Sequence, residues 1–241
     1  IDRTGKEIDY FEHYPSEQQL KAIRRVARIE GSIPVKYGYV DAFRTAKIQA
    51  FDEALPFFEN RAAVRLGERF GYISTSGDMV IVPQFKRAGH FKNGLSSVAV
   101  LIDAADQRTM RYGLIDSLGK YVIPPVYDFL GDPSEETVVF GIGDGNGNVT
   151  KYGLLSVSGD TLIAPTLENA RFMSEGLIAV QTKKNYGYMN VKGELVIPSN
   201  YYSAGPFKNG AATVRLAEEK YAVINTSGKI IFGPYTQKLF D

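Results

Sequence analysis

An internal repeat constrains the fold of this chain more than any other feature. An aromatic residue followed by glycine recurs along the sequence at steps of 33, 42, 40, 34 and 35 residues. The copies are Tyr37-Gly38, Phe70-Gly71, Tyr112-Gly113, Tyr152-Gly153 and Tyr186-Gly187, with Tyr221-Ala222 as a sixth, altered copy. Two further markers follow five of these pairs, one six residues after the second residue of the pair and the other 11 or 12 residues after it. These are a second glycine (Gly77, Gly119, Gly159, Gly193, Gly228) and a proline (Pro83, Pro124, Pro165, Pro198, Pro234). Self-similarity at this period indicates a stack of small units that share a continuous core.

Each unit has the pattern of three short β-strands. Residues 112–116 (YGLID) and 120–124 (KYVIP) flank a turn with Asp, Asn or Ser at its first position and glycine at its fourth. That chemistry is typical of a type I turn followed by a left-handed glycine. We expect the proline to end the second strand, because it cannot donate to a sheet ladder. Residues 95–101 (LSSVAVL) have the pattern of the third strand.

The glycine of the aromatic-Gly pair has two possible uses, a left-handed backbone or close packing. Ala222 in the sixth copy favours packing, because alanine tolerates a crowded site better than a positive φ. We expect the aromatic residue beside it to belong to the core rather than to a ligand platform.

The predicted fold is therefore all-β, with tandem three-stranded antiparallel repeats stacked as an open solenoid or superhelical array. A closed β-propeller is the alternative. We expect one domain over residues 1–241, with a partial unit at 1–30, units starting near 36, 69, 111, 151 and 185, and a terminal partial unit at 220–241. A short helix is expected near 16–24, followed by extended structure at 26–30. Residues 1–8 (IDRTGKEI) match the middle of a unit, so we expect the natural protein to extend beyond Ile1.

A fourth marker is an aromatic residue, a small-residue turn and an apolar run. It occurs at 91–100 (FKNGLSSVAV), 172–180 (FMSEGLIAV) and 207–216 (FKNGAATVRL). Residues 58–66 (FENRAAVRL) are a variant with Arg61 at the glycine position. Residues 133–139 (PSEETVV) depart from the pattern.

These markers together resemble the bacterial WG repeats, in which an aromatic-Gly pair precedes a glycine turn, Val-Ile-Pro and Phe-x-x-Gly-Leu. The copies at 69–95 and 111–128 carry the resemblance most fully. The tryptophan that names the family is Tyr or Phe here, and the chain contains no tryptophan. The resemblance implies a β-rich interaction module of envelope or secreted bacterial proteins, located outside the cytoplasm, with no catalytic residues to carry over.

The composition excludes several kinds of chemistry. The net charge of +1 gives no field that would recruit nucleic acid, and no apolar run is long enough to insert into a membrane. The absence of cysteine excludes thiolate catalysis and thiolate metal sites. Asp144, Asn146 and Asn148 begin like a calcium loop, but Val149 and Leu155 stand where that loop needs glycine and glutamate. We therefore expect no catalytic residues, no cofactor and no metal.

Two long connections mark the expected binding surface. Residues 101–110 (LIDAADQRTM) and 141–148 (GIGDGNGN) lie at equivalent places in successive units, and insertions at equivalent places often line one binding face. The candidate residues are Asp103, Asp106, Arg108, Asp144, Asn146 and Asn148. The leading hypothesis is a non-catalytic binding or scaffold module for a protein or a cell-envelope polymer, in an oligomeric state that stays open. The alternative is a carbohydrate-active enzyme or glycan-binding module that uses carboxylates assembled by the fold.

Overall fold

Six antiparallel sheets make up the part of the chain that the computed structural model describes, which is residues 25–29, 36–40, 47–102, 109–145 and 148–236. We number the sheets 1 to 6 along the chain. Sheet 1 contains β1 (Arg25–Ile29), β2 (Lys36–Val40) and β3 (Lys47–Phe51). Sheet 2 contains β4 (Glu53–Ala54), β5 (Arg61–Leu66), β6 (Arg69–Ser74) and β7 (Met79–Phe85). Sheet 3 contains β8 (Arg87–Ala88), β9 (Leu95–Leu101), β10 (Met110–Asp116) and β11 (Tyr121–Tyr127).

The other three sheets have the same order as sheets 2 and 3, with one edge strand, two middle strands and a second edge strand. Sheet 4 contains β12 (Phe129–Leu130), β13 (Thr137–Gly143), β14 (Val149–Ser156) and β15 (Thr161–Leu167). Sheet 5 contains β16 (Asn169–Ser174), β17 (Leu177–Thr182), β18 (Asn185–Asn190) and β19 (Leu195–Tyr201). Sheet 6 contains β20 (Ser203–Ala204), β21 (Ala211–Ala217), β22 (Lys220–Asn225) and β23 (Ile230–Thr236). The all-β prediction is confirmed.

The sequence repeat and the sheet are offset from each other. The third strand predicted for one unit, β9, pairs with β10, which is the first strand of the next unit. A further short strand, β8, pairs with the other edge of β9 and follows β7 after Lys86 alone. The structure thus adds a fourth strand to the three that the sequence predicted. It also makes each unit span two sheets, so that neighbouring sheets are tied together by the chain itself.

The proline of each unit does not end its strand, so that prediction is wrong. Strand β7 runs on through Pro83 to Phe85, and β11 runs through Pro124 and Pro125 to Tyr127. Both are edge strands, where a missing N–H costs no ladder bond. The pairing of β6 with β7 shifts register between Phe70 and Tyr72, which marks a bulge opposite the proline.

The glycine of the aromatic-Gly pair makes room for this bulge. A Cβ atom at Gly71 would lie 2.4 Å from the carbonyl oxygen of Ile81 and 2.8 Å from the nitrogen of Pro83. Gly71 is not among the glycines with positive φ, whereas the turn glycine Gly77 has φ of 92°. Close packing is therefore the role of the first glycine and left-handed geometry the role of the second.

The hydrophobic core lies between the sheets rather than within one layer. The cluster between sheets 2 and 3 joins Tyr72 and Phe85 to Phe91 and Val98. Four further clusters fill the other junctions in the same way. The aromatic residues of the pairs are half-buried and pack against these clusters, as Phe70 does here. Each junction therefore has its own core, as expected for a repeat array.

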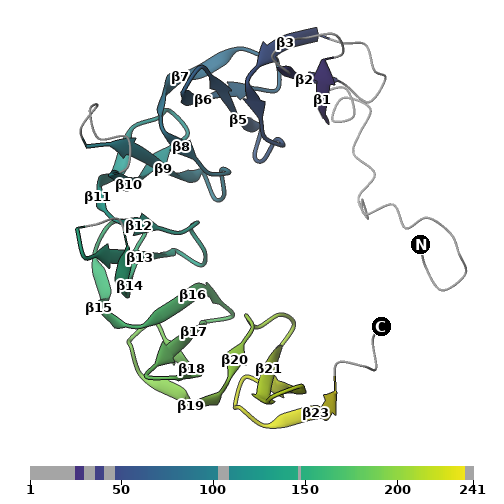
Figure 1. Ribbon diagram of the computed structural model, residues 1–241, viewed down its shortest axis with the longest axis vertical. Helices are drawn as coiled ribbons and strands as arrows, with labels where there is room; N and C mark the ends of the chain where they lie inside the picture. The colour runs from purple at the N-terminus through teal and green to yellow at the C-terminus, as the bar shows by residue number, and fades with distance from the viewer. Residues whose placement is uncertain (1–24, 30–35, 41–46, 103–108, 146–147, 237–241) are drawn as a thin grey trace, which may run out of the picture.

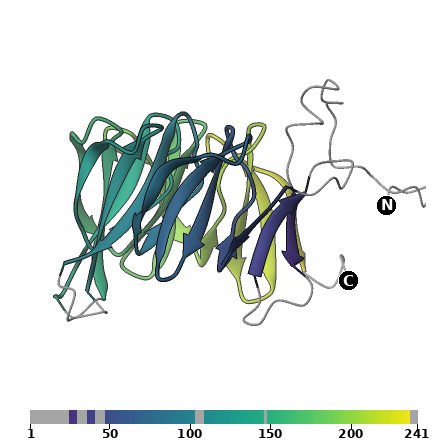
Figure 2. The same ribbon diagram turned by 90° about the horizontal axis from the view of Figure 1, so that it is seen from above.

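The six sheets follow one another around an arc (Figure 1), and seen from above their strands stand side by side (Figure 2). Sheets 1 and 6 lie at the two ends of the arc, and no strand of one pairs with a strand of the other among the described residues. Four-stranded sheets arranged around a common centre are propeller-like, while the described arc itself is open. Both features agree with the predicted repeat array.

The N-terminal part of the chain is described only in sheet 1. Strand β1 confirms extended structure at 26–29, and the helix expected near 16–24 lies outside the described residues. No helix in the described ranges has the length and apolar character that crossing a membrane requires.

Candidate functional site

The two long connections occupy equivalent places, as the sequence indicated. The first links the middle strands β9 and β10 of sheet 3, and the second links the middle strands β13 and β14 of sheet 4. Asp103, Asp106, Arg108 and Asn146 lie outside the described residues. Asp144 and Asn148 bond to each other, with Asn148 Nδ2 donating to Asp144 Oδ2 at 3.2 Å and the Asp144 amide to the Asn148 carbonyl at 3.0 Å. These bonds close the base of the 141–148 connection, and whether it binds a ligand stays a prediction.

A second set of turns lies at the opposite ends of β9 and β13. In each of these tip turns two residues with positive φ come directly before a middle strand, as in the two-residue type I′ turn. The five tip turns are Glu59-Asn60, Asn93-Gly94, Glu135-Glu136, Glu175-Gly176 and Asn209-Gly210. Positive φ suits glycine and asparagine, so the Glu135-Glu136 turn is the most strained of the five.

The register of the first tip turn differs by one residue from the sequence alignment. The backbone bridge from Phe58 to Arg61 is equivalent to the bridge from Lys92 to Leu95. Phe57, rather than Phe58, thus corresponds to the buried Phe91, and Asn60 takes the place of the glycine. The expectation that Arg61 replaces the glycine is therefore wrong.

Carboxylates connect the tip turns of neighbouring sheets. Glu59 accepts hydrogen bonds from the amides of Asn93 at 2.7 Å and Gly94 at 2.8 Å, so one side chain binds both amides of the next turn. Glu135 binds the amides of Glu175 and Gly176 in the same way, the latter at 2.8 Å. Hydrogen bonds to an ionised acceptor are stronger than neutral ones. These contacts form a series of hydrogen bonds from sheet to sheet, which we call the carboxylate ladder.

The ladder continues from sheet 5 to sheet 6 but is interrupted between sheets 3 and 4. Glu175 Oε2 accepts from the Gly210 amide at 2.9 Å. Between sheets 3 and 4 the residue at the equivalent position is Asn93, and within the described chain no carboxylate reaches the Glu135-Glu136 turn from sheet 3. Lys92 Nζ donates to Ser134 Oγ at 3.4 Å instead.

After the carboxylate ladder, the second contact that recurs between sheets is a buried tyrosine packed against a phenylalanine. The ring centroids of Tyr72 and Phe91 are 4.8 Å apart, and the Tyr72 hydroxyl donates to the Gly89 carbonyl at 3.0 Å. Burial raises the pKa of Tyr72 far above the ordinary range of a phenol. The same arrangement recurs with Tyr188 and Phe207, at 4.8 Å.

This aromatic pair is replaced on both sides of sheet 4. Leu114 and Pro133 stand in its place between sheets 3 and 4, and Leu154 and Met173 between sheets 4 and 5. Sheet 4 is thus flanked by two junctions without the pair, one of which has also lost the carboxylate ladder.

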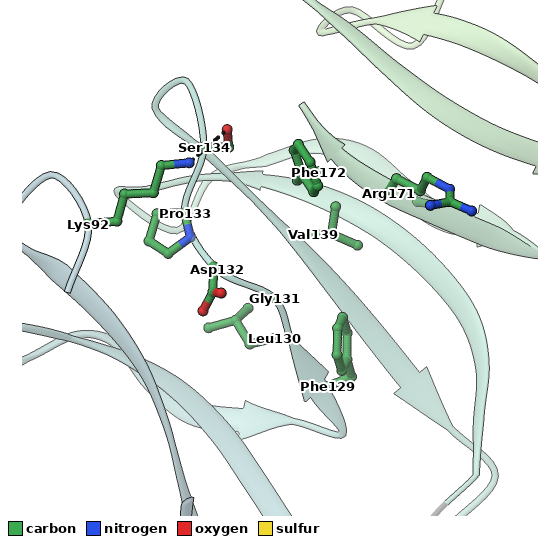
Figure 3. Close-up of a pocket in the computed structure, with 11 residues that line it drawn as sticks. Lys92, Phe129, Leu130, Gly131, Asp132, Pro133, Ser134, Val139, Arg171 and Phe172 are labelled. Carbon is green, nitrogen blue, oxygen red and sulfur yellow. Dashed lines mark hydrogen bonds between the residues drawn. The ribbon is translucent and has the colours of Figure 1, made fainter. Parts of the chain in front are cut away.

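A groove of about 550 Å³ opens along sheet 4 between these two junctions. Figure 3 shows Phe129, Val139 and Phe172 on one side of the groove, and Lys92, Asp132 and Pro133 on the other. Phe172 is 50% exposed, whereas Leu130 and Val139 are buried. An apolar lining with a few polar groups at its rim is typical of a binding site.

Charges of both signs stand at the rim of this groove. Lys92 approaches Ser134 at one end, and Arg171 lies beyond Phe172 at the other (Figure 3). Asp132 Oδ1 accepts a hydrogen bond from Ser97 Oγ at 3.2 Å, which fixes the carboxylate on the sheet 3 side. The described residues contain no group of three or more acidic or histidine side chains arranged to hold a metal. The groove is therefore suited to recognising a ligand with an apolar part and a charged part.

Sequence reasoning missed this groove although two signals were present in the sequence. The departure at 133–139 was visible as a unit that lacks Phe-x-x-Gly-Leu. The second signal was leucine, at Leu114 and Leu154, where other units have a tyrosine such as Tyr72, and Leu114 lies at the same junction as the departure. Neither signal has meaning until the structure shows that both changes meet at one place.

Comparison with known proteins identifies the family. The family model described as WG containing repeat matches residues 37–69, 70–100, 112–144, 152–186 and 186–221. The chain is therefore a repeat protein of stacked β-sheets, and it belongs to the WG repeat family. None of the curated proteins compared with it matches.

Similar solved structures include BamB from Moraxella catarrhalis, which is 12% identical over 89% of this chain and 74% of its own, with a TM-score of 0.48. The computationally designed Ika8 protein is 11% identical over 84% of this chain and 70% of its own, with a TM-score of 0.48. A putative TolB from Agrobacterium tumefaciens is 9% identical over 76% of this chain and 82% of its own, with a TM-score of 0.41. These likenesses do not bear on what the chain binds.

Proposed function

We propose that this chain is a non-catalytic binding module that engages a partner protein through the groove along sheet 4. The observation that carries the proposal is the coincidence of three changes at one place. The Tyr-Phe pair is missing on both sides of sheet 4, the carboxylate ladder is interrupted on one side, and Phe172 stands half exposed beside the resulting groove. Exposed aromatic anchors next to buried apolar residues are the usual centres of protein interfaces.

A carbohydrate-active enzyme is the alternative that the sequence left open. Hydrolysis of glycosides needs a pair of carboxylates at a fixed separation. Asp132 is the single acidic residue among the described residues that line the groove, and it is held by Ser97. The groove therefore favours binding over glycoside hydrolysis. The six residues at the long connections stay a second, separate proposal for a binding surface.

The experiment that tests this function offers the immobilised full chain a displayed random-peptide library and a glycan panel side by side. Phe172→Asp places a charge in the groove, and Leu118→Asp, at a turn residue that is 83% exposed, is the matched control. We expect peptides to be enriched on the wild type and on the Leu118 variant and to be lost on the Phe172 variant. Equal enrichment on all three, or none on any, would overturn the proposal, and glycan binding that requires Asp132 would favour the alternative.

A further inference from the structure

We propose that the Glu135-Glu136 turn, with Lys92 beside it, is a carboxylate-binding site that receives an acidic side chain of the partner peptide. The apolar neighbours of that side chain would then occupy the groove, so the inference rests on the proposed function and names the ligand chemistry. Its support comes from the way in which the chain satisfies its other tip turns.

The chain itself supplies the precedent for carboxylate binding. Four tip turns follow a described tip turn, and three of them receive a glutamate from the preceding sheet. Two of these three bind the carboxylate through both turn amides, at Asn93-Gly94 and at Glu175-Gly176. Consecutive backbone amides that converge on one anion form a recurring type of anion site. The turn geometry of this fold can therefore bind a carboxylate.

The fourth of these turns has the same backbone but no internal carboxylate. Glu135 and Glu136 have φ of 50° and 58°, close to the 52° and 75° of Asn93 and Gly94. The equivalent donor position in sheet 3 is Asn93, whose side chain is neutral and one methylene shorter than glutamate. Both residues of the turn are exposed, and within the described chain no acceptor reaches their amides. The pair of amides is thus open to a carboxylate from outside.

The charges around this turn also fit an acidic ligand. Lys92 is exposed, and its Nζ lies 3.4 Å from the hydroxyl of Ser134, the residue just before the turn. The Glu135 carboxylate is directed away, because it binds the amides of sheet 5. The Glu136 carboxylate is exposed and opposes an incoming anion, and the ammonium group of Lys92 compensates for it.

The position of the turn next to the groove defines the ligand further. Ser134 and Pro133 line the groove and immediately precede the two amides. A ligand that binds both must therefore carry an apolar side chain close to its acidic one. The chain contains such a sequence, since Phe57 and Phe58 precede Glu59, which binds a tip turn of this kind. The ligand class is a peptide in which one or two large apolar residues adjoin a glutamate.

The test uses an acetylated, amidated peptide with the sequence of residues 54–61 (ALPFFENR) and a second peptide with glutamine in place of Glu59. The readout is the amide resonances of Glu135 and Glu136 in the isotope-labelled full chain. We expect the glutamate peptide to shift these two resonances and the glutamine peptide to bind about tenfold more weakly, the loss expected when a charge-assisted bond becomes a neutral one. Equal binding of the two peptides would overturn the carboxylate site.

A pair of variants in sheet 3 tests the same site from within. Asn93→Glu restores the missing rung of the ladder, so it should melt at a higher temperature than Asn93→Gln, which has the same backbone strain, and should reduce peptide binding about tenfold or more. Asn93→Gln has the same length and takes the same left-handed backbone without the charge, so it should lower the melting temperature slightly and leave peptide binding unchanged. Unaltered peptide binding in Asn93→Glu would overturn the inference, whether or not the melting temperature rises. If Phe172→Asp abolishes peptide binding while Asn93→Glu does not, the carboxylate site fails and the groove stands; if neither does, the proposed function fails.

Discussion

Two neighbouring junctions have the same backbone but different side chains. The first lies between sheets 2 and 3, and the second lies between sheets 3 and 4. The first has the Tyr72-Phe91 pair and the Glu59 carboxylate on the next tip turn. The second has Leu114 and Pro133 instead of the pair, and Asn93 instead of the glutamate. The core of the second junction is filled in part by Tyr127 and Phe140, whose ring centroids are 5.0 Å apart. A WG-repeat junction thus tolerates the loss of both the aromatic pair and the carboxylate, and the groove along sheet 4 opens beside the place where they are lost.

The largest expected difference in stability between the two junctions concerns the aromatic ring that precedes the tip turn, which is Phe91 at the first junction. Phe91 is 2% exposed, so Phe91→Ala should lower the free energy of unfolding by about 3–5 kcal/mol. Pro133→Ala removes two methylene groups at the equivalent place and should cost about 1–2 kcal/mol. Urea denaturation of both variants measures the difference. If the two variants lost equal stability, the aromatic pair would not be what distinguishes the junctions.

The buried tyrosine hydroxyl should give the second largest difference. Tyr72→Phe leaves the Gly89 carbonyl and Ser96 without their partner in a buried site, so it should lower the unfolding free energy by about 1–3 kcal/mol. Tyr112→Phe is the matched control, because Tyr112 is half-buried and its packing survives the change. We expect the control to stay within about 0.5 kcal/mol of the wild type. A control that lost as much as Tyr72→Phe would assign the effect to the ring rather than to the hydroxyl.

Backbone strain also distinguishes the tip turns of the two junctions. Here a substitution at the second junction should stabilise the protein, and one at the first should destabilise it. Glu136 has φ of 58°, so Glu136→Gly should raise the unfolding free energy by about 1 kcal/mol. Gly94→Ala introduces the same type of strain at φ of 75°, where an added Cβ would meet nothing within 4 Å, and should lower it by about 1 kcal/mol. Thermal melts of the two variants should move to opposite sides of the wild type. Shifts of the same sign would show that strain does not separate the turns.

The sequence predicted those parts of the fold that leave a periodic pattern. The aromatic-Gly pair, the turn glycine and the apolar runs each recur, so the strands, the hairpins and the repeat array followed from them. The strand Arg87–Ala88 left no pattern, because two residues are too few to show alternation. The proline was misinterpreted because sequence alone does not tell an edge strand from the end of a strand. Only pairing in three dimensions shows that Pro83 lies on an edge opposite Gly71.

The candidate site was less predictable than the fold for a related reason. Glu59 and Glu135 look like any surface glutamates in the sequence, and their partners lie 34 to 41 residues away. Their importance follows from the stacking of sheets, which sets the distance between successive tip turns. The departure at 133–139 was visible, but its meaning depends on Asn93, which precedes it by a whole unit.

The smallest expected effect concerns one rung of the carboxylate ladder. Glu59→Gln keeps the shape of the side chain and replaces two charge-assisted bonds by neutral ones, so it should lower the unfolding free energy by about 0.5–1 kcal/mol. Because Glu59 and its partners are exposed, the difference from wild type should shrink as salt is added. Glu136→Gln is the control, since no amide of a neighbouring turn bonds to that side chain in the described structure, and it should leave the melting temperature unchanged at all salt concentrations. A salt-independent loss in Glu59→Gln would mean that shape rather than charge holds the turn. It would also weaken the case that the open Glu135-Glu136 turn selects a carboxylate, because that case depends on the ladder being electrostatic.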